Sequence, residues 1–130
     1  MTYRVSLPIF IMIAGLLVSD CFRSGQSPAE VVKAFYAEAN QGHYAEGEKF
    51  LSAKTRHELE AGLGSREQGR KMILDGETRN GTIDRVVVVT ERVNGDNATV
   101  VIKVIYRNGE TWDGKRMLVK ESGEWKVSFL

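Results

Sequence analysis

The side chains of this chain that could transfer a proton are few and widely spaced. Proton transfer next to a carbonyl needs an acid or base, such as Asp or His, paired with a hydrogen-bonding Tyr inside a pocket. The candidates are His43, His57, Asp75, Asp84, Asp113, Tyr36 and Tyr106. Nothing in their spacing joins them into a catalytic set, so no catalytic residue is predicted.

Local sequence context favours non-catalytic positions for both histidines. His43 follows a glycine that ends a predicted helix, where a ring usually faces solvent. His57 lies within a run of basic and acidic residues typical of a solvated helix face. Asp113 precedes a glycine on a predicted strand, so its side chain could point into the fold or out to solvent.

The sequence predicts no metal, no cofactor and no nucleic-acid partner. Two His and one Cys do not form a cluster with zinc-ligand spacing, and no glycine-rich phosphate loop or exposed-serine elbow occurs. The 18 basic and 17 acidic residues give a net charge of +1, and the two signs are interleaved along the chain. Nucleic-acid binding would need a basic stripe, which is missing from this pattern.

Aromatic residues are the best candidates for a small apolar ligand site. Concave binding sites are mostly apolar with a few placed polar groups. The candidate ligand-binding residues are Tyr36, Phe50, Tyr106, Trp112 and Trp125, with Phe35 beside the first. Aromatic residues at helix and strand spacing are, however, more often part of the core, and that interpretation is favoured.

The first half of the chain is predicted to be helical. Ser27 can cap a helix, Pro28 fits its first position, and Glu30 completes a capping box. Apolar residues then recur at helical spacing as far as Ala39, and residues 40–42 end the helix. Further helices are expected over 43–51, over 53–61, and after the capping-box pattern of residues 65–68.

The second half is predicted to form four strands, over residues 83–93, 98–107, 110–121 and 124–130. Because the connecting turns are short, these strands must be antiparallel neighbours. Alternation places Val100, Ile102, Val104 and Tyr106 on one face, and Trp125, Val127 and Phe129 on one face. Residues 86–89 are apolar on both faces, so that strand is either covered twice or offers its outer face to a partner. The expected fold class is α+β, with helices packed on a curved four-stranded antiparallel sheet.

The N-terminus predicts export and lipid attachment. A basic start precedes about 14 mostly apolar residues, which suits a signal peptide and is too short for a membrane span. Residues 17–21 resemble the bacterial lipobox, in which the sulfur of the cysteine receives a diacylglyceryl group. Cys21 is the only cysteine; Asp20 departs from the small residue usual at that place. The predicted organisation is a signal peptide over 1–20, a lipidated tether over 21–26 and one domain over 27–130.

Taken together, the lipobox, the opening Ser27–Tyr36 segment, the four strands and the closing Gly123–Val127 segment resemble a known family. It is that of small bacterial lipoproteins of unknown function in the nuclear-transport-factor-two-like (SnoaL-like) superfamily. The resemblance implies a cone-shaped, cystatin-like fold, a curved sheet around a long helix, often with a pocket between them. Because that superfamily holds enzymes and binding modules alike, the fold cannot choose the function.

Three functions are compatible with these observations. The preferred one is a non-catalytic binding or interaction module, anchored to the bacterial cell envelope by acylated Cys21, with a small apolar ligand or a protein partner. The second is a small-molecule isomerase or lyase using a pocket Asp or His. The third is a structural homodimer formed through the sheet. A buried ionisable group facing an enclosed cavity would favour the second.

Overall fold

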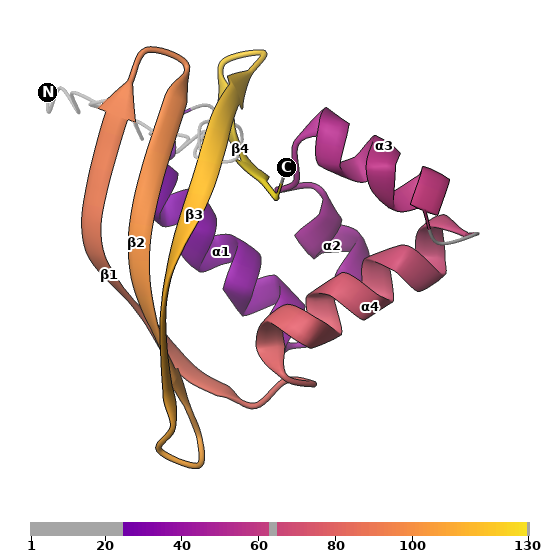
Figure 1. The fold of residues 1–130 in the computed structure, drawn as a ribbon, viewed down its shortest axis with the longest axis vertical. Coiled ribbons are helices and arrows are strands. Elements are labelled where there is room, and N and C mark those ends of the chain that lie inside the picture. The colour runs from indigo at the N-terminus through magenta and orange to yellow at the C-terminus, as the bar shows by residue number, and fades with distance from the viewer. Residues whose placement is uncertain (1–24, 63–64, 130) are drawn as a thin grey trace, which may run out of the picture.

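The computed structural model describes residues 25–62 and 65–129, and the predicted signal peptide, Cys21 and most of the tether lie outside these residues. The chain forms four helices and then four strands (Figure 1). The helices are α1 (Pro28–Asn40), α2 (Tyr44–Glu48), α3 (Ala53–Gly62) and α4 (Arg66–Thr78). The strands are β1 (Ile83–Asn94), β2 (Asn97–Tyr106), β3 (Thr111–Glu121) and β4 (Glu124–Ser128). The α+β fold class is confirmed.

Helix α1 begins as its sequence predicts. The Ser27 hydroxyl accepts a hydrogen bond from the Glu30 amide, and the Glu30 carboxylate accepts one from the Ser27 amide, both at 3.2 Å. This reciprocal capping box satisfies two of the amides that a helix start leaves unpaired. The apolar face of α1, formed by Val31, Val32, Phe35, Tyr36 and Ala39, is buried against the sheet.

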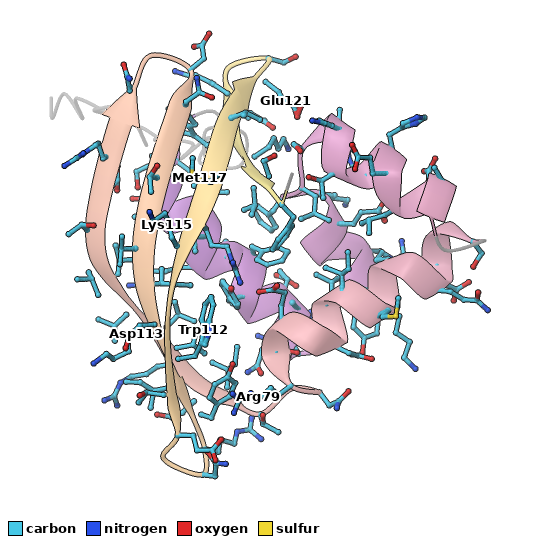
Figure 2. The ribbon with its side chains drawn as sticks, in the orientation of Figure 1. Arg79, Trp112, Asp113, Lys115, Met117 and Glu121 are labelled. Carbon is cyan, nitrogen blue, oxygen red and sulfur yellow. The ribbon has the colours of Figure 1, made fainter. Side chains whose placement is uncertain are left out.

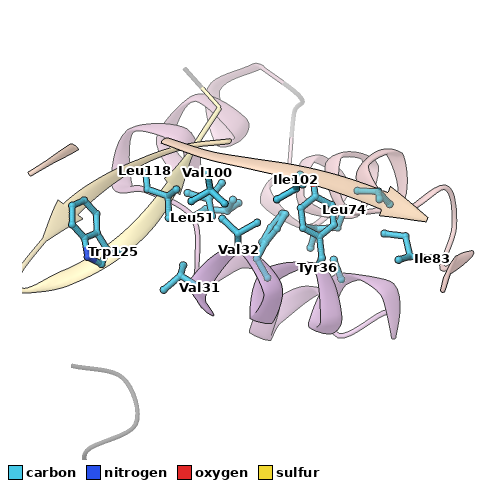
Figure 3. Packing of buried hydrophobic residues seen from close by; sticks show 14 of the residues in the cluster. Val31, Val32, Tyr36, Leu51, Leu74, Ile83, Val100, Ile102, Leu118 and Trp125 are labelled. Atoms are coloured by element: carbon cyan, nitrogen blue, oxygen red, sulfur yellow. The ribbon is translucent and has the colours of Figure 1, made fainter. Parts of the chain in front are cut away.

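The sheet is an antiparallel meander with strand order β1-β2-β3-β4. Its concave side holds the helices, and α1 crosses it at a steep angle (Figure 1). The predicted inner row of β2 is confirmed, because Val100, Ile102 and Val104 are fully buried. Side chains from α1, β2, β3 and β4 form one core, shown in Figure 3.

Two predicted elements are shorter in the structure. The helix expected over 43–51 ends at Glu48, because residues 50–52 turn to pair with β4: Val127 N donates to Phe50 O at 2.7 Å and Ser52 N to Val127 O at 2.8 Å. Strand β4 ends at Ser128 and not at 130, since the amide of Phe129 donates to the Thr55 hydroxyl. In both places, the hydrogen bonds that would continue the helix or the strand are replaced by hydrogen bonds between segments far apart in the sequence. Local sequence patterns do not encode such contacts.

The domain has two ends along its longest axis (Figure 1). One end, called the tether end below because the predicted tether precedes α1, carries the start of α1 and the turns at 94–97 and 121–124. A hydrogen bond of 2.8 Å from Lys120 N to Asp96 O joins these two turns. The opposite end, called the cleft end below, carries the end of α4 and the turn at 107–110. No helix within the described residues is long and apolar enough to cross a membrane.

Candidate functional site

One hollow lies at the cleft end, between the last turn of α4 and the inner face of β2 and β3. It measures about 180 Å³ and is lined by Gly76, Glu77, Arg79, Tyr106, Trp112 and Arg116. We call it the α4–sheet cleft. Figure 2 shows Trp112 of β3 and Arg79 beyond the end of α4 on this side of the sheet. Its lining is mainly polar, which differs from the apolar pocket that the sequence predicts.

The position of Trp112 depends on a glycine two residues along β3. Trp112, Gly114 and Arg116 alternate onto the inner face, opposite the buried Val104, Ile102 and Val100 of β2. The Trp112 ring occupies the space over Gly114, because a Cβ atom there would lie only 1.9 Å from the ring atom Cη2. Laying an aromatic ring over a strand glycine compensates for its missing side chain. The ring is therefore held by the backbone beneath it.

An ionic network forms the floor of the cleft. The Arg116 guanidinium donates to the Glu77 carboxylate through Nη2 and to the Tyr36 hydroxyl through Nε at 2.8 Å. The Tyr36 hydroxyl in turn donates to Glu77 at 2.8 Å. The Arg116 side chain is 14% exposed and that of Glu77 21% exposed. The guanidinium also lies 4.8 Å from the Trp112 ring centroid, within reach of a cation–π attraction.

The network changes the acidity of Tyr36. Burial raises the pKa of the Tyr36 phenol well above its usual value near 10, and the negative charge of Glu77 raises it further. Because the folded pKa lies above the unfolded one, the corresponding stability is fully present below about pH 10 and is lost as pH rises further. Tyr44 has its pKa raised too, through its hydrogen bond to Asp75.

We expect Tyr36→Phe to flatten the loss of stability at alkaline pH. At neutral pH the variant should lose about 1 kcal/mol, because Glu77 and Arg116 each lose a hydrogen-bond partner. Between about pH 9.5 and 11.5, its stability should fall less steeply than that of the parent protein. Urea unfolding across this range measures the slopes, with Tyr106→Phe as the control for loss of one tyrosine. Parallel slopes for parent and Tyr36→Phe would contradict the assignment.

Arg79 lines the cleft from the end of α4. It caps the end of α4 in the left-handed conformation, with φ of 48°, and Asn80 and Gly81 follow with φ of 59° and 80°. This turn brings the guanidinium over the Tyr106 ring, 4.0 Å from its centroid. Nη1 donates to Glu110 at 2.7 Å, in an ion pair whose side chains are 48% and 63% exposed. Such an exposed pair contributes little stability.

The five aromatic residues predicted to bind a ligand do not form one pocket. Tyr106 and Trp112 line the α4–sheet cleft, and Tyr36 lies buried beneath it. Phe50 and Trp125 line a separate hollow of about 20 Å³ near Gln26, towards the tether end. Phe35 is core, packed against Tyr36 and Phe129.

The His and Asp candidates for proton transfer lie elsewhere. None of His43, His57, Asp75, Asp84 and Asp113 lines the α4–sheet cleft. His43 is exposed beside Glu38 at 2.8 Å, and Asp75 binds the Tyr44 hydroxyl in a different hollow. The sequence left open whether Asp113 points into the fold or out to solvent. Its side chain points to the outer face, where it is 69% exposed and its Oδ1 lies 4.0 Å from Lys103 Nζ. The described residues hold no group of acidic, His or Cys side chains suited to a metal.

Residues 86–89 expose one of their two apolar faces, on the outer side of the sheet. Strand β1 is an edge strand, and its outer side chains are exposed, so it is not covered on both faces within the described residues. Val86 and Val88 pack on the core, whereas Val87 and Val89 are 40% and 56% exposed. Met117 of β3, labelled in Figure 2, is 49% exposed on the same outer side. Basic side chains accompany these residues, among them Arg85, Lys103 and Lys115.

Sequence reasoning missed Glu77, Arg79 and Arg116. Each is a charged residue with no motif around it, and such residues are usually solvated. The one available signal was the alternation of side chains along a strand. Arg116 shares its strand face with Trp112 and Leu118 of β3, so it must face the core side and needs a buried partner. Nothing comparable identifies Glu77, because α4 has a charged residue on most of its faces.

Comparison with solved structures shows the fold. A protein from Campylobacter jejuni named "Putative NTF2-like transpeptidase" shares 18% identity, with a TM-score of 0.61 over 81% of this chain and all of that chain. A SEC-C motif containing protein from Rhodopseudomonas palustris shares 15% identity, with a TM-score of 0.55 over 79% of this chain and 78% of that chain. An uncharacterized cystatin fold protein from Novosphingobium aromaticivorans shares 14%, with a TM-score of 0.49 over 82% and 99%.

At these identities the likeness concerns the fold alone, which is nuclear-transport-factor-two-like as the sequence predicts. No curated protein matches the sequence. Residues 19–128 match the family described as "Domain of unknown function (DUF4878)". This match covers most of the chain, from the segment before Cys21 to the end of β4. The chain therefore belongs to the DUF4878 family.

Proposed function

We propose that this protein is a non-catalytic binding module of the bacterial cell envelope, anchored by a lipid on Cys21, with the α4–sheet cleft as its ligand site. The observation that carries the proposal is the construction of the cleft. A partly exposed Trp ring and two guanidinium groups line it, and the ring and Arg116 are fixed in place from beneath. Small-molecule sites orient their ligands with a few precisely placed polar groups, and this cleft supplies such groups in a lining that is more polar than usual.

Support for the anchor comes from the sequence. The single cysteine lies three residues after the end of an apolar run of signal-peptide length and precedes a short polar segment. Diacylglyceryl attachment followed by cleavage would leave the domain a few residues from the bilayer. Multiple acyl chains hold a protein firmly, since each buried methylene contributes about 0.8 kcal/mol.

The anchor is tested by the intact mass of protein purified from bacterial membranes, native and as Cys21→Ala. We expect a native mass equal to a chain starting at Cys21 plus acyl groups, and loss of acylation and of membrane association in the variant. A native protein that keeps Met1 or carries no lipid would contradict the anchor and would show that Asp20 blocks processing.

A homodimer formed through the sheet is a second candidate, favoured by the exposed Val87, Val89 and Met117 on the outer face. Exposed apolar side chains grouped on one face often mark a protein interface. Sedimentation equilibrium of the parent protein and of Val89→Lys decides it. A dimer that the substitution converts to monomer would support it, whereas a monomeric parent would exclude it.

A further inference from the structure

From the chemistry of the α4–sheet cleft we infer its ligand class: a small, water-soluble anion whose carboxylate or phosphate is carried on a ring. The inference rests on the proposed function, because it specifies what the same cleft binds. Its first basis is charge. The lining holds two guanidinium groups and one carboxylate, and a second carboxylate, that of Glu110, pairs with Arg79 at 2.7 Å from outside the lining. A ligand anion that displaces Glu110 therefore meets a lining with a charge of +1.

Arg79 is the group that would take the anion. Within the described part of the chain, its guanidinium donates to Glu110 only, through Nη1. That pair is exposed on both sides, so replacing Glu110 with another anion, or adding one, costs little. The Tyr106 ring beneath holds the guanidinium plane in position. A guanidinium offers paired N–H donors that match a carboxylate or a phosphate.

Arg116 contributes charge and rigidity more than free donors. Three hydrogen bonds fix it, to Glu77, to the Tyr36 hydroxyl and to Lys115 O. Glu77 is correspondingly occupied and cannot readily accept from a ligand. The cleft therefore offers a ligand more donors than acceptors, which selects against a cationic ligand.

Trp112 provides the surface for a ring. Its indole is half-buried in the wall, with Gly114 behind it and the Arg116 guanidinium 4.8 Å from its centroid, and the rest of the ring lines the hollow. A rigid ring, whether planar or a sugar ring with a face of C–H groups, packs on an indole with little loss of conformational entropy. Fatty chains are poorly matched to this lining, because its other side chains are charged or are covered by Arg79.

The position of the cleft agrees with a soluble ligand. Residues 21–26 span at most about 20 Å when extended, and they lead to the tether end. Strand β3 runs from the cleft end to that end, a length of about 30 Å. Figure 2 shows this separation between Glu121 at one end and Trp112 and Arg79 at the other. The cleft thus lies at the end of the domain remote from the proposed anchor.

The test uses the full chain with ¹⁵N-labelled tryptophan, because the sequence has only two indoles. Trp112 reports on the cleft, and Trp125 at the tether end is the internal reference. The probes are glucuronate and glucose 6-phosphate, which carry an anion on a ring, and glucose, acetate and palmitate, which lack one of the required features. The variants are Arg79→Gln and, as a charge-matched control on the outer face, Lys103→Gln.

We expect titrations followed by the Trp112 indole signal to give one of the two ring-bearing anions a dissociation constant at least tenfold lower than that of glucose or acetate. Arg79→Gln should remove this preference, and Lys103→Gln should keep it. Tighter binding of glucuronate would indicate a carboxylate site, and tighter binding of glucose 6-phosphate would indicate a phosphate site. A Trp112 response to glucose or palmitate of equal strength would overturn the ligand class but leave the cleft as a binding site. Silence of Trp112 with every probe would overturn both proposals.

Discussion

Glu77→Ala should lower the free energy of unfolding by about 2–4 kcal/mol, because it leaves the largely buried Arg116 guanidinium without its counter-ion. Removing one partner of a fully buried pair costs about 3–5 kcal/mol. The value expected here is lower, since the Glu77 side chain is one-fifth exposed and water can partly screen the charge. Urea unfolding followed by circular dichroism measures the change.

Removing both charges should restore much of this loss. A Glu77→Leu/Arg116→Met double variant replaces the ionic floor of the cleft with apolar side chains, and such replacements are often close to neutral. The losses of stability in Glu77→Leu alone and in Arg116→Met alone should therefore sum to more than the loss in the double variant, by more than about 1 kcal/mol. Glu110→Ala, which breaks the exposed pair with Arg79, is the matched control and should change stability by less than about 0.5 kcal/mol. Additive effects, or equal losses at Glu77 and Glu110, would show that the network is not a coupled unit.

The fold was largely predictable because its determinants are local. The Ser27–Glu30 capping box, the alternation of Val100, Ile102 and Val104, and the turn signals between strands each act over a few residues. Short turns then force antiparallel neighbours, which fixes the strand order without any knowledge of distant contacts. Helix and sheet faces that need covering complete the α+β arrangement.

The cleft was only partly predictable because it depends on contacts far apart in the sequence. Glu77 and Arg116 are 39 residues apart, and Tyr36 and Arg116 are 80 apart. The rings of Tyr106 and Trp112 were candidates by residue type, but so were Phe50 and Trp125, which lie at another hollow. Which aromatic residues share a wall depends on where α4 lies relative to the sheet. That position depends on packing between distant helices, for instance on the close approach of Gly47 of α2 to Leu74 of α4.

The predicted strand ends show the same limit. Periodicity continues through Phe129, yet the strand stops at Ser128 because the Thr55 hydroxyl captures the next amide. Residues 50–52 likewise leave a helical pattern to pair with β4. In both places a backbone donor has a choice of partner, and the tertiary partner wins.

The second large effect is expected at Gly114. Gly114→Ala should lower the free energy of unfolding by about 1–3 kcal/mol, although Ala is ordinarily at least as favourable as Gly in a strand. The reason is steric: three ring atoms of Trp112 lie within 2.4 Å of the position that the new methyl group would take. The ring must rotate away from β3, and it then loses its place beside Arg116. The Trp112 indole signal should move accordingly, while that of Trp125 should not.

Gly76 supplies the matched control, because a Cβ there meets nothing within 4 Å and the residue lies inside α4. Gly76→Ala should therefore stabilise the protein by about 0.5–1 kcal/mol, the opposite sign for the same chemical change. If the Trp112 ring causes the loss at Gly114, Gly114→Ala should cost almost nothing in a Trp112→Ala background. An unchanged cost in that background would place the strain in the backbone of β3. The cleft would then keep its aromatic wall whatever residue stands at position 114.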